Sequence, residues 1–289
     1  MSTRWVTVDG LEMACLELGS PAGPLALCLH GFPDTAHTWR HLLPVLAEAG
    51  YHAVAPYMRG YAPSGIPADG CYQTGALADD AIAIHRALDA DADAVLVGHD
   101  WGALAAYGAA GAAPERWRRV VAMSVPPLPA SAAGFFTYAQ LKRSFYVFLA
   151  QMDLADAVVA GDDFAFVRSL WADWSPGYDA TADLAEVRRA LSGEGRVAAA
   201  LGYYRAMFDA TRHRPDHEVA QRCATGVPPQ PTLYLHGADD GCIGAELAGS
   251  VPDLLAPGSA AEVVASAGHF LHLQRPDLVN ERIADFVAS

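Results

Sequence analysis

Cysteines are few in this chain of 289 residues, and they do not form an obvious pairing pattern. The five are Cys15, Cys28, Cys71, Cys223 and Cys242. They contain no CxxC pair, and an odd number leaves one thiol over. This pattern excludes a disulfide framework and indicates reduced, structural cysteines of the kind found in cytoplasmic proteins.

Basic residues are also scarce, since 19 lysines and arginines face 33 aspartates and glutamates, giving a formal net charge of −14. A protein that binds nucleic acid normally carries a basic surface, so this balance argues against such a partner. Charged residues make up only 18% of the chain and hydrophobic ones 52%, which excludes general disorder. A monomer of this size buries about three quarters of its unfolded surface, so its core needs no metal or disulfide.

Long apolar runs are absent as well. The most apolar window, residues 94–113, contains His99, Asp100 and several glycines, and is a poor membrane span. The first residues show no apolar segment of the kind found in a secretory signal peptide. We therefore expect a cytoplasmic protein without a membrane partner.

Two proline-rich stretches, Pro126–Pro129 and Pro228–Pro231, divide the sequence into parts with different patterns. Outside them, short apolar runs alternate with helix-like segments, which predicts a parallel sheet covered on both faces. The predicted strands are Leu25–Leu29, Ala53–Ala55, Ala94–Val97, Val120–Met123, Thr232–Leu235 and Glu262–Val264, and the predicted helices are Leu42–Ala49, Ala78–Leu88, Ala103–Ala113 and Asp277–Val287. Residues Thr7–Leu18, with Asp9-Gly10 between two runs, predict an antiparallel hairpin.

Between the two proline stretches the strand signals stop. Helical spacing or composition is found in Phe135–Gln151, Asp163–Ala172, Ala182–Leu191 and Val197–Ala210. The sequence thus predicts an α/β core, residues 1–125 and 226–289, interrupted by a helical cap at about 126–225.

The strongest motif is Gly98-His99-Asp100-Trp101-Gly102, which follows a predicted strand and opens a predicted helix. A nucleophile elbow has this context, because its sharp turn needs small residues beside the nucleophile. Asp100 stands where serine is usual. A carboxylate is ionised at neutral pH and attacks carbon directly to form an ester with the enzyme.

Three further motifs follow predicted strands. His30-Gly31-Phe32-Pro33 places a loop that can aim a backbone N–H at the site, and a second N–H comes from the residue after the nucleophile. Phe32 and Trp101 are therefore the candidates for an oxyanion hole, while the ring of His30 is expected to pack structurally.

The other two motifs, His236-Gly237-Ala238-Asp239-Asp240 and Gly268-His269, supply an acid and a base. We expect His269 to activate water, with an aspartate orienting its ring. Asp240 is favoured over Asp239 from its distance to the preceding glycine, although the sequence alone allows either. His272 is expected to be a packing or surface residue.

The order Asp100, Asp240, His269 resembles that of the α/β-hydrolase superfamily, and the motifs are similar to those of its epoxide hydrolases. The resemblance covers nearly the whole chain. It rests on the motifs at residues 30–33, 98–102 and 268–269, together with Trp39-Arg40, Ala55-Pro56 and Arg59-Gly60-Tyr61. It implies two cap tyrosines that hold the epoxide oxygen. The family has one tyrosine five residues before a glutamine and the other directly before an arginine, and these positions correspond to Tyr146, before Gln151, and Tyr204, before Arg205. The alternative is that both tyrosines only pack in an aromatic core of the cap. The chain departs from the family pattern at three positions. It has Tyr57 where the family often has an acidic residue, Ala62 where the family often has glycine, and Asp34 where the family often has glutamate.

The resemblance implies conversion of an epoxide and water to a vicinal diol, with a small apolar epoxide as partner and no cofactor.

Haloalkane and haloacid dehalogenases are the main alternative enzymes. In that case the indole N–H of Trp101, Trp171 or Trp174 would donate a hydrogen bond to the leaving halide. However, Phe32 stands where many haloalkane dehalogenases have a polar halide ligand. The residue after Asp100 is also not the arginine found in fluoroacetate dehalogenases. A binding protein without turnover is the rival from another class. The sequence leaves the oligomeric state, including a homo-oligomer, open.

A metal site is weighed at His213 and His217, which lie near Asp216, Glu218 and Cys223. Pro215 interrupts the helix face that the histidines would need, so a solvated stretch is expected and no metal is predicted.

Overall fold

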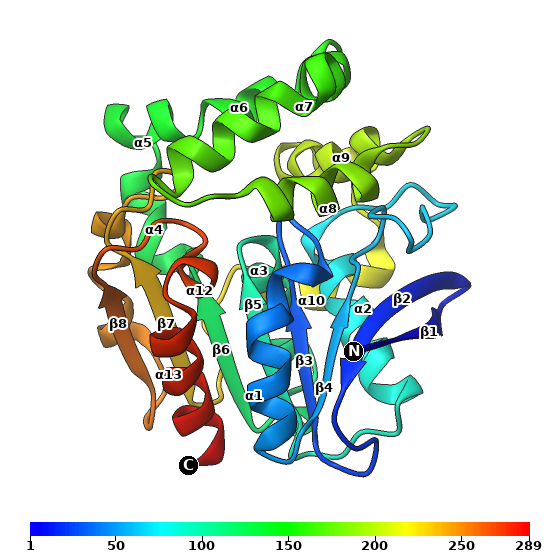
Figure 1. Ribbon diagram of the computed structural model, residues 1–289, viewed down its shortest axis with the longest axis vertical. Helices are drawn as coiled ribbons and strands as arrows, with labels where there is room; N and C mark the ends of the chain where they lie inside the picture. The colour runs from blue at the N-terminus through cyan, green and yellow to red at the C-terminus, as the bar shows by residue number, and fades with distance from the viewer.

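The structure is a computed structural model that describes all 289 residues, and its centre is one twisted eight-stranded sheet (Figure 1). The strand order is β1-β2-β4-β3-β5-β6-β7-β8, in which β1 and β2 are antiparallel and β3 to β8 are parallel. The bounds are β1 (Ser2–Val8), β2 (Leu11–Leu18), β3 (Leu25–Leu29), β4 (His52–Pro56), β5 (Val95–His99), β6 (Arg119–Met123), β7 (Thr232–Gly237) and β8 (Ala260–Val264).

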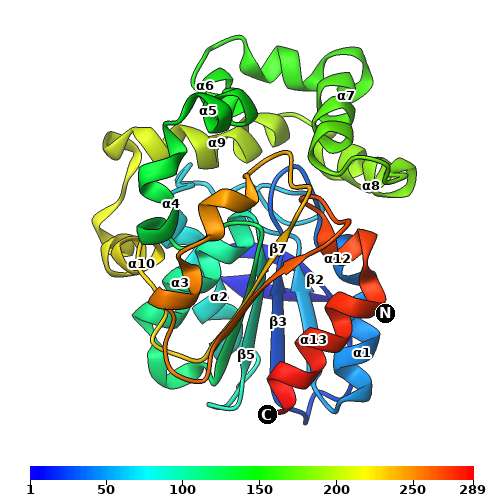
Figure 2. The same ribbon diagram turned by 90° about the vertical axis from the view of Figure 1, so that its left-hand side faces the viewer.

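Helices cover both faces of this sheet (Figure 2). On one face lie α1 (Leu42–Glu48) and α13 (Pro276–Ala288), packed on side chains such as Val97 and Val121. On the other lie α2 (Thr74–Ala87) and α3 (Trp101–Ala112), packed on alternate strand positions such as Leu27 and Leu96, and α10 (Glu218–Ala224) packs on these two helices. Strands buried on both faces read as continuous apolar runs, which is why the sequence predicted them. The predicted α/β-hydrolase fold class is confirmed.

Six further helices lie beyond the carboxyl ends of the parallel strands, at the top of Figures 1 and 2. They are α4 (Leu128–Phe135), α5 (Tyr138–Arg143), α6 (Phe145–Leu149), α7 (Ala155–Trp174), α8 (Thr181–Leu191) and α9 (Arg196–Phe208). The short elements that complete the chain are η1 (Ala36–His41), η2 (Pro114–Arg116), η3 (Ala210–Arg212), η4 (Pro215–His217), η5 (Ala245–Ala248), α11 (Val251–Leu254) and α12 (Leu271–Gln274).

Within this helical part, the structure differs from the predicted segments in two places. The segment Phe135–Gln151 forms parts of three short helices, because Thr137 caps a new helix by accepting the Gln140 N–H. Helix α7 begins earlier than predicted and is interrupted at Gly161–Phe164, where three successive residues have positive φ. Pro129 lies in the first turn of α4, where its missing N–H costs no helical hydrogen bond.

Two sequence expectations concern the whole chain. All five cysteines are unpaired thiols. No helix combines the length and apolar content required to cross a membrane.

Candidate active site

Asp100 occupies a strained turn between β5 and α3. Its backbone angles, φ 53° and ψ −120°, lie in a sparsely populated region whose cost is about 1–3 kcal/mol. A Cβ on Gly98 would lie 2.2 Å from the Gly102 carbonyl oxygen, and one on Gly102 would lie 2.0 Å from that of Leu29. Both glycines are therefore required, and the turn presents the Asp100 carboxylate at the carboxyl edge of the sheet.

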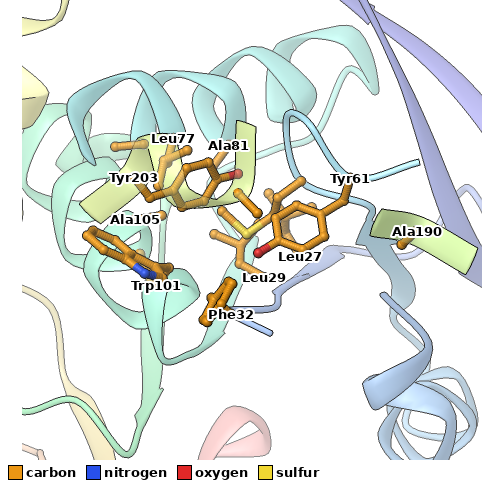
Figure 3. Close-up of a cluster of buried hydrophobic side chains, with 14 of the residues drawn as sticks. Leu27, Leu29, Phe32, Tyr61, Leu77, Ala81, Trp101, Ala105, Ala190 and Tyr203 are labelled. Atoms are coloured by element: carbon orange, nitrogen blue, oxygen red, sulfur yellow. The ribbon is translucent and has the colours of Figure 1, made fainter. Parts of the chain in front are cut away.

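The Asp100 carboxylate has one partner on each side. The Phe32 N–H, in the loop after β3, donates to Oδ1 at 2.8 Å, and His269 Nε2 lies 3.7 Å from Oδ2. Trp101, the first residue of α3, follows directly. Figure 3 shows the rings of Phe32 and Trp101 gathered with Tyr203 and Tyr61 over Leu27 and Leu29. The predicted nucleophile and the two predicted oxyanion residues thus lie together.

Asp240, rather than Asp239, contacts His269. Asp240 Oδ2 lies 3.0 Å from His269 Nδ1, and Oδ1 accepts the N–H groups of Cys242 at 2.7 Å and Ile243 at 2.9 Å. Asp240 is buried, whereas Asp239 is exposed. This arrangement fixes the carboxylate and leaves His269 Nε2, which has no hydrogen-bond partner, directed to Asp100.

The charge state of His269 follows from its neighbours. Burial disfavours the imidazolium, but the Cys242 thiol, the Asp240 carboxylate with its hydrogen bond, and the nearby Asp100 carboxylate outweigh burial and raise the pKa of His269 well above its usual value. Because burial raises the pKa of Cys242 itself, that thiol is neutral and the two carboxylates carry the effect. His269 is therefore an imidazolium between two anions while Asp100 is free.

Two phenols, Tyr146 of α6 and Tyr204 of α9, face this site from the helices above it. Their rings are 5.5 Å apart, and both residues are buried. Burial raises the pKa of each well above its usual value, and the nearby Asp100 charge adds to the effect. Both hydroxyls therefore stay protonated and are able to donate hydrogen bonds.

Neighbouring Tyr203 differs from Tyr204 in its hydrogen bonding. The Tyr203 hydroxyl donates to the Arg59 carbonyl at 2.7 Å, as a structural tyrosine does. The Tyr204 hydroxyl is buried without such a partner, and its ring packs edge-on against Trp101 and Phe32. Tyr204 is therefore the tyrosine free to hold the epoxide oxygen, and it is also the one that the family pattern indicates.

Two buried polar side chains of this site, Cys242 and Gln140, were not predicted from the sequence. Cys242 Sγ lies 3.2 Å from the Tyr146 hydroxyl, in the loop of Asp240. Gln140 of α5 donates to the Cys242 carbonyl at 2.9 Å and accepts the Gly244 N–H at 3.0 Å. Cys242 follows Asp240 by two residues, which was a local signal, but nothing near Gln140 indicated its contact.

Three other histidines near the site have structural partners. His30 accepts the Met58 N–H at 3.0 Å, His99 Nε2 contacts the His269 carbonyl at 2.9 Å, and His272 Nε2 contacts Thr38 at 2.6 Å. Burial lowers the pKa of His30 to about 4 and of His99 to about 3, so both are neutral. The expectations that His30 and His272 pack structurally agree with these contacts.

The site is closed in this structure. Asp100 is 5% exposed, His269 0% and Tyr204 2%. The end of α7 contributes to this closure, since the Trp174 carbonyl accepts the N–H groups of His269 and Gly241. Substrate entry therefore requires a displacement of the helices above the sheet.

Comparisons with known proteins agree with this architecture. Residues 24–276 match the family described as the alpha/beta hydrolase fold. Epoxide hydrolase A of Mycobacterium tuberculosis is 30% identical, over 98% of this chain and 96% of that protein.

Among solved structures, epoxide hydrolase A of Mycobacterium thermoresistibile is 28% identical, with a TM-score of 0.79 over 100% of this chain and 98% of that one. The epoxide hydrolase of Bacillus megaterium, solved with an inhibitor, is 26% identical, with a TM-score of 0.84 over 99% and 100%.

Proposed function

This chain belongs to the α/β-hydrolase family, and we propose that it is an epoxide hydrolase that converts a small apolar epoxide and water to a vicinal diol. The observation that carries the proposal is the pair of protonated phenols, Tyr146 and Tyr204, facing an aspartate nucleophile. No cofactor enters the scheme. Asp100, Asp240 and His269 form the reacting set, with Phe32 and Trp101 supplying backbone N–H groups.

In the first step, an Asp100 oxygen attacks a ring carbon of the epoxide. The C–O bond of the ring breaks, its electron pair stays on the epoxide oxygen, and a phenol of Tyr146 or Tyr204 supplies the proton. Two phenols lower the barrier because they donate to an oxygen whose negative charge grows as the ring opens. The product is a hydroxyalkyl ester of Asp100.

Ester formation also prepares the base for the second step. The ester is uncharged, so His269 loses one of its two anionic neighbours and its pKa falls. Its proton passes, directly or through water, to the phenolate left by the first step, which restores the tyrosine hydroxyl. Neutral His269 then takes a proton from water, which attacks the ester carbonyl carbon. The N–H groups of Phe32 and Trp101 stabilise the resulting oxyanion. Its collapse breaks the bond to the diol oxygen, which takes up the proton left on the carboxyl group, so that the diol leaves, Asp100 is again a carboxylate and His269 is again an imidazolium.

The dehalogenase alternative has less support from the site. A leaving halide needs N–H donors, but the Trp171 indole already donates to the Pro33 carbonyl at 2.9 Å. The Trp174 ring packs against Tyr146 and His269. Phe32 offers only its backbone, and that N–H is directed to Asp100. Tyr146 and Tyr204 stay protonated, so they are able to give a proton to the oxygen of an opening epoxide, whereas a halide leaves without needing one.

A parallel assay of aryl epoxides, alkyl epoxides and bromoalkanes tests this proposal. We expect diol from epoxides and no bromide release. Bromide release without diol formation would indicate a dehalogenase. Binding of epoxides or bromoalkanes without turnover would indicate a receptor-like protein.

The two adjacent tyrosines provide a matched comparison. Tyr204→Phe should lower the rate of ester formation by about 10²-fold, as expected when one of the donors to a developing oxyanion is removed. Tyr203→Phe should leave that rate nearly unchanged and instead cost about 1–3 kcal/mol of stability, because the Arg59 carbonyl loses its donor. Single-turnover kinetics and thermal melting of both variants measure the two effects. Equal kinetic losses would contradict the assignment of Tyr204.

The coupling between Asp100 and His269 predicts a pKa difference. Asp100→Asn carries no charge at the nucleophile, like the ester, so the imidazolium of His269 loses an attractive neighbour and its pKa should fall below that of the unaltered protein. An NMR pH titration of imidazole resonances measures this shift, with His269→Gln identifying the signal among 11 histidines. An unchanged or higher pKa would contradict the coupling.

We also propose that residues 126–225 include the cap that closes over substrate. Helices α5, α6, α7 and α9 supply its contacts with the site, whereas α10 packs on α2 and α3. We further propose a cytoplasmic protein that binds neither nucleic acid nor membrane, consistent with its net charge and its apolar substrate. A homo-oligomer is compatible with this scheme.

A further inference from the structure

Outside the active site, the fold brings three metal-binding side chains together. One ligand atom each from Asp69, Cys71 and His217 lies within 4.8 Å of the others. Asp69 and Cys71 come from the loop between β4 and α2, whereas His217 ends η4, far along the chain. His213, which the sequence placed beside His217, instead contacts the Ala206 carbonyl at 2.7 Å.

We propose that Asp69, Cys71 and His217 bind a divalent cation of borderline softness, such as Zn²⁺. A thiolate, an imidazole and a carboxylate are the protein ligands that zinc takes, with water able to complete the tetrahedron. Binding releases the thiol proton of Cys71 and the Nε2 proton that His217 carries beside Asp79. The Cys71 thiolate and the Asp69 carboxylate then balance the charge of the ion.

The environment of His217 matches that of a metal ligand. Its Nδ1 lies 2.7 Å from Oδ2 of Asp79, a residue of α2. Histidines that bind metals commonly donate their other ring N–H to a carboxylate, which fixes the ring and increases its basicity. Since Asp79 occupies Nδ1, Nε2 is the nitrogen left for the cation.

The thiol of Cys71 is held in place by its backbone contacts. The Cys71 N–H donates to Asp69 Oδ1 at 3.0 Å, and the Cys71 carbonyl accepts Arg59 Nη1 at 2.7 Å. Arg59 is itself fixed by two 2.7 Å contacts to Asp80. One wall of the site is therefore rigid before a cation arrives.

Closure of the site requires only a small rearrangement. Zinc ligands stand about 2.0–2.3 Å from the ion, closer together than these atoms are now. Asp69 is exposed and is free to rotate inwards, exchanging its 3.6 Å contact with Arg214 for the cation. Arg214 keeps Asp216 as a second acidic neighbour. A cavity of about 410 Å³, lined by Asp69, Arg214, Asp216 and His217 among others, gives access.

A bound cation would add metal–ligand bonds between two segments that are already joined by the contacts of Arg214 with Asp69 and of His217 with Asp79. It would fasten the stretch between α9 and α10, at the end of the proposed cap, to the loop before α2. The expected consequence is stabilisation rather than a part in the reaction.

Titration of the full-length protein with Cd²⁺, followed by the ultraviolet thiolate-to-cadmium band, tests the proposal. We expect one equivalent to saturate the band. Cys71→Ser should remove it, whereas Cys223→Ser, a matched change at a half-exposed thiol, should retain it. Asp79→Asn should weaken binding by about 10–100-fold through its effect on His217. Zn²⁺ should raise the melting temperature of the unaltered protein but not that of His217→Gln.

Two outcomes would overturn the proposal. One is the absence of a saturable band in the unaltered protein. The other is a band that survives Cys71→Ser and disappears in Cys242→Ser, because Asp240, Cys242 and His269 also lie within 4.8 Å of one another in the active site. Retention of the band in Cys242→Ser supports the site at Cys71.

Discussion

Replacing Asp100 by alanine should reduce epoxide hydrolysis by about 10⁴-fold or more, the scale found when a nucleophile is removed from a site whose residues act as a unit. Alanine provides no oxygen to attack the ring, so no ester forms. Steady-state diol production and intact mass after mixing with substrate measure the loss.

Asp239→Ala is the matched control, because it removes the same charge from an exposed neighbour of the acid. Its activity should stay close to that of the unaltered protein. The Asp100→Ala protein should remain folded, since the substitution removes a charge with little exposure and leaves both glycines of the turn in place. Diol formation at an undiminished rate by Asp100→Ala would contradict the assignment of the nucleophile.

Replacing His269 by glutamine should have a different effect on the same reaction. The ester still forms, because Asp100 and the two tyrosines are intact, but the base that activates water is missing. Loss of general-base catalysis lowers the second step by about 10²–10⁴-fold, so the ester accumulates. Intact mass spectrometry should show the protein plus one substrate molecule, and peptide mapping should locate the addition at Asp100.

His41→Gln serves as the control, since His41 is exposed and lies away from the reacting set. It should turn over without accumulating an adduct. If His269→Gln lost activity without an adduct, with an epoxide that the unaltered protein hydrolyses, His269 would be needed before the covalent step. The division of labour between Asp100 and His269 would then be wrong.

The sequence predicted the sheet and the candidate site together because of one property of parallel strands. Their carboxyl ends meet at the same edge, so motifs that each follow an apolar run converge in space. Asp100 follows β5, Phe32 lies just after β3, and Asp240 lies just after β7. At the acid position the geometry favours Asp240, which contacts His269 and is buried, over Asp239, which is exposed.

What the sequence could not predict depends on packing between distant segments. The contact of Cys242 with Tyr146 exists because α6 lies over the loop after β7. The different partners of Tyr203 and Tyr204 depend on the rotation of α9 about its axis, which hydrophobic spacing does not define to one residue. The cluster of Asp69, Cys71 and His217 joins the core loop before α2 to a residue near the end of the helical insertion. No local pattern carried that information.

The source of the oxygen in the first molecule of diol tests the covalent scheme most directly. A single turnover, with protein in excess over epoxide, is run in water enriched in ¹⁸O. Water attacks the ester carbonyl, so the account predicts a diol without the label and one ¹⁸O atom in the Asp100 carboxylate, detected in the peptide that contains it. Label in the diol from that first turnover, with none in Asp100, would mean that water attacks the epoxide itself, and would contradict the account.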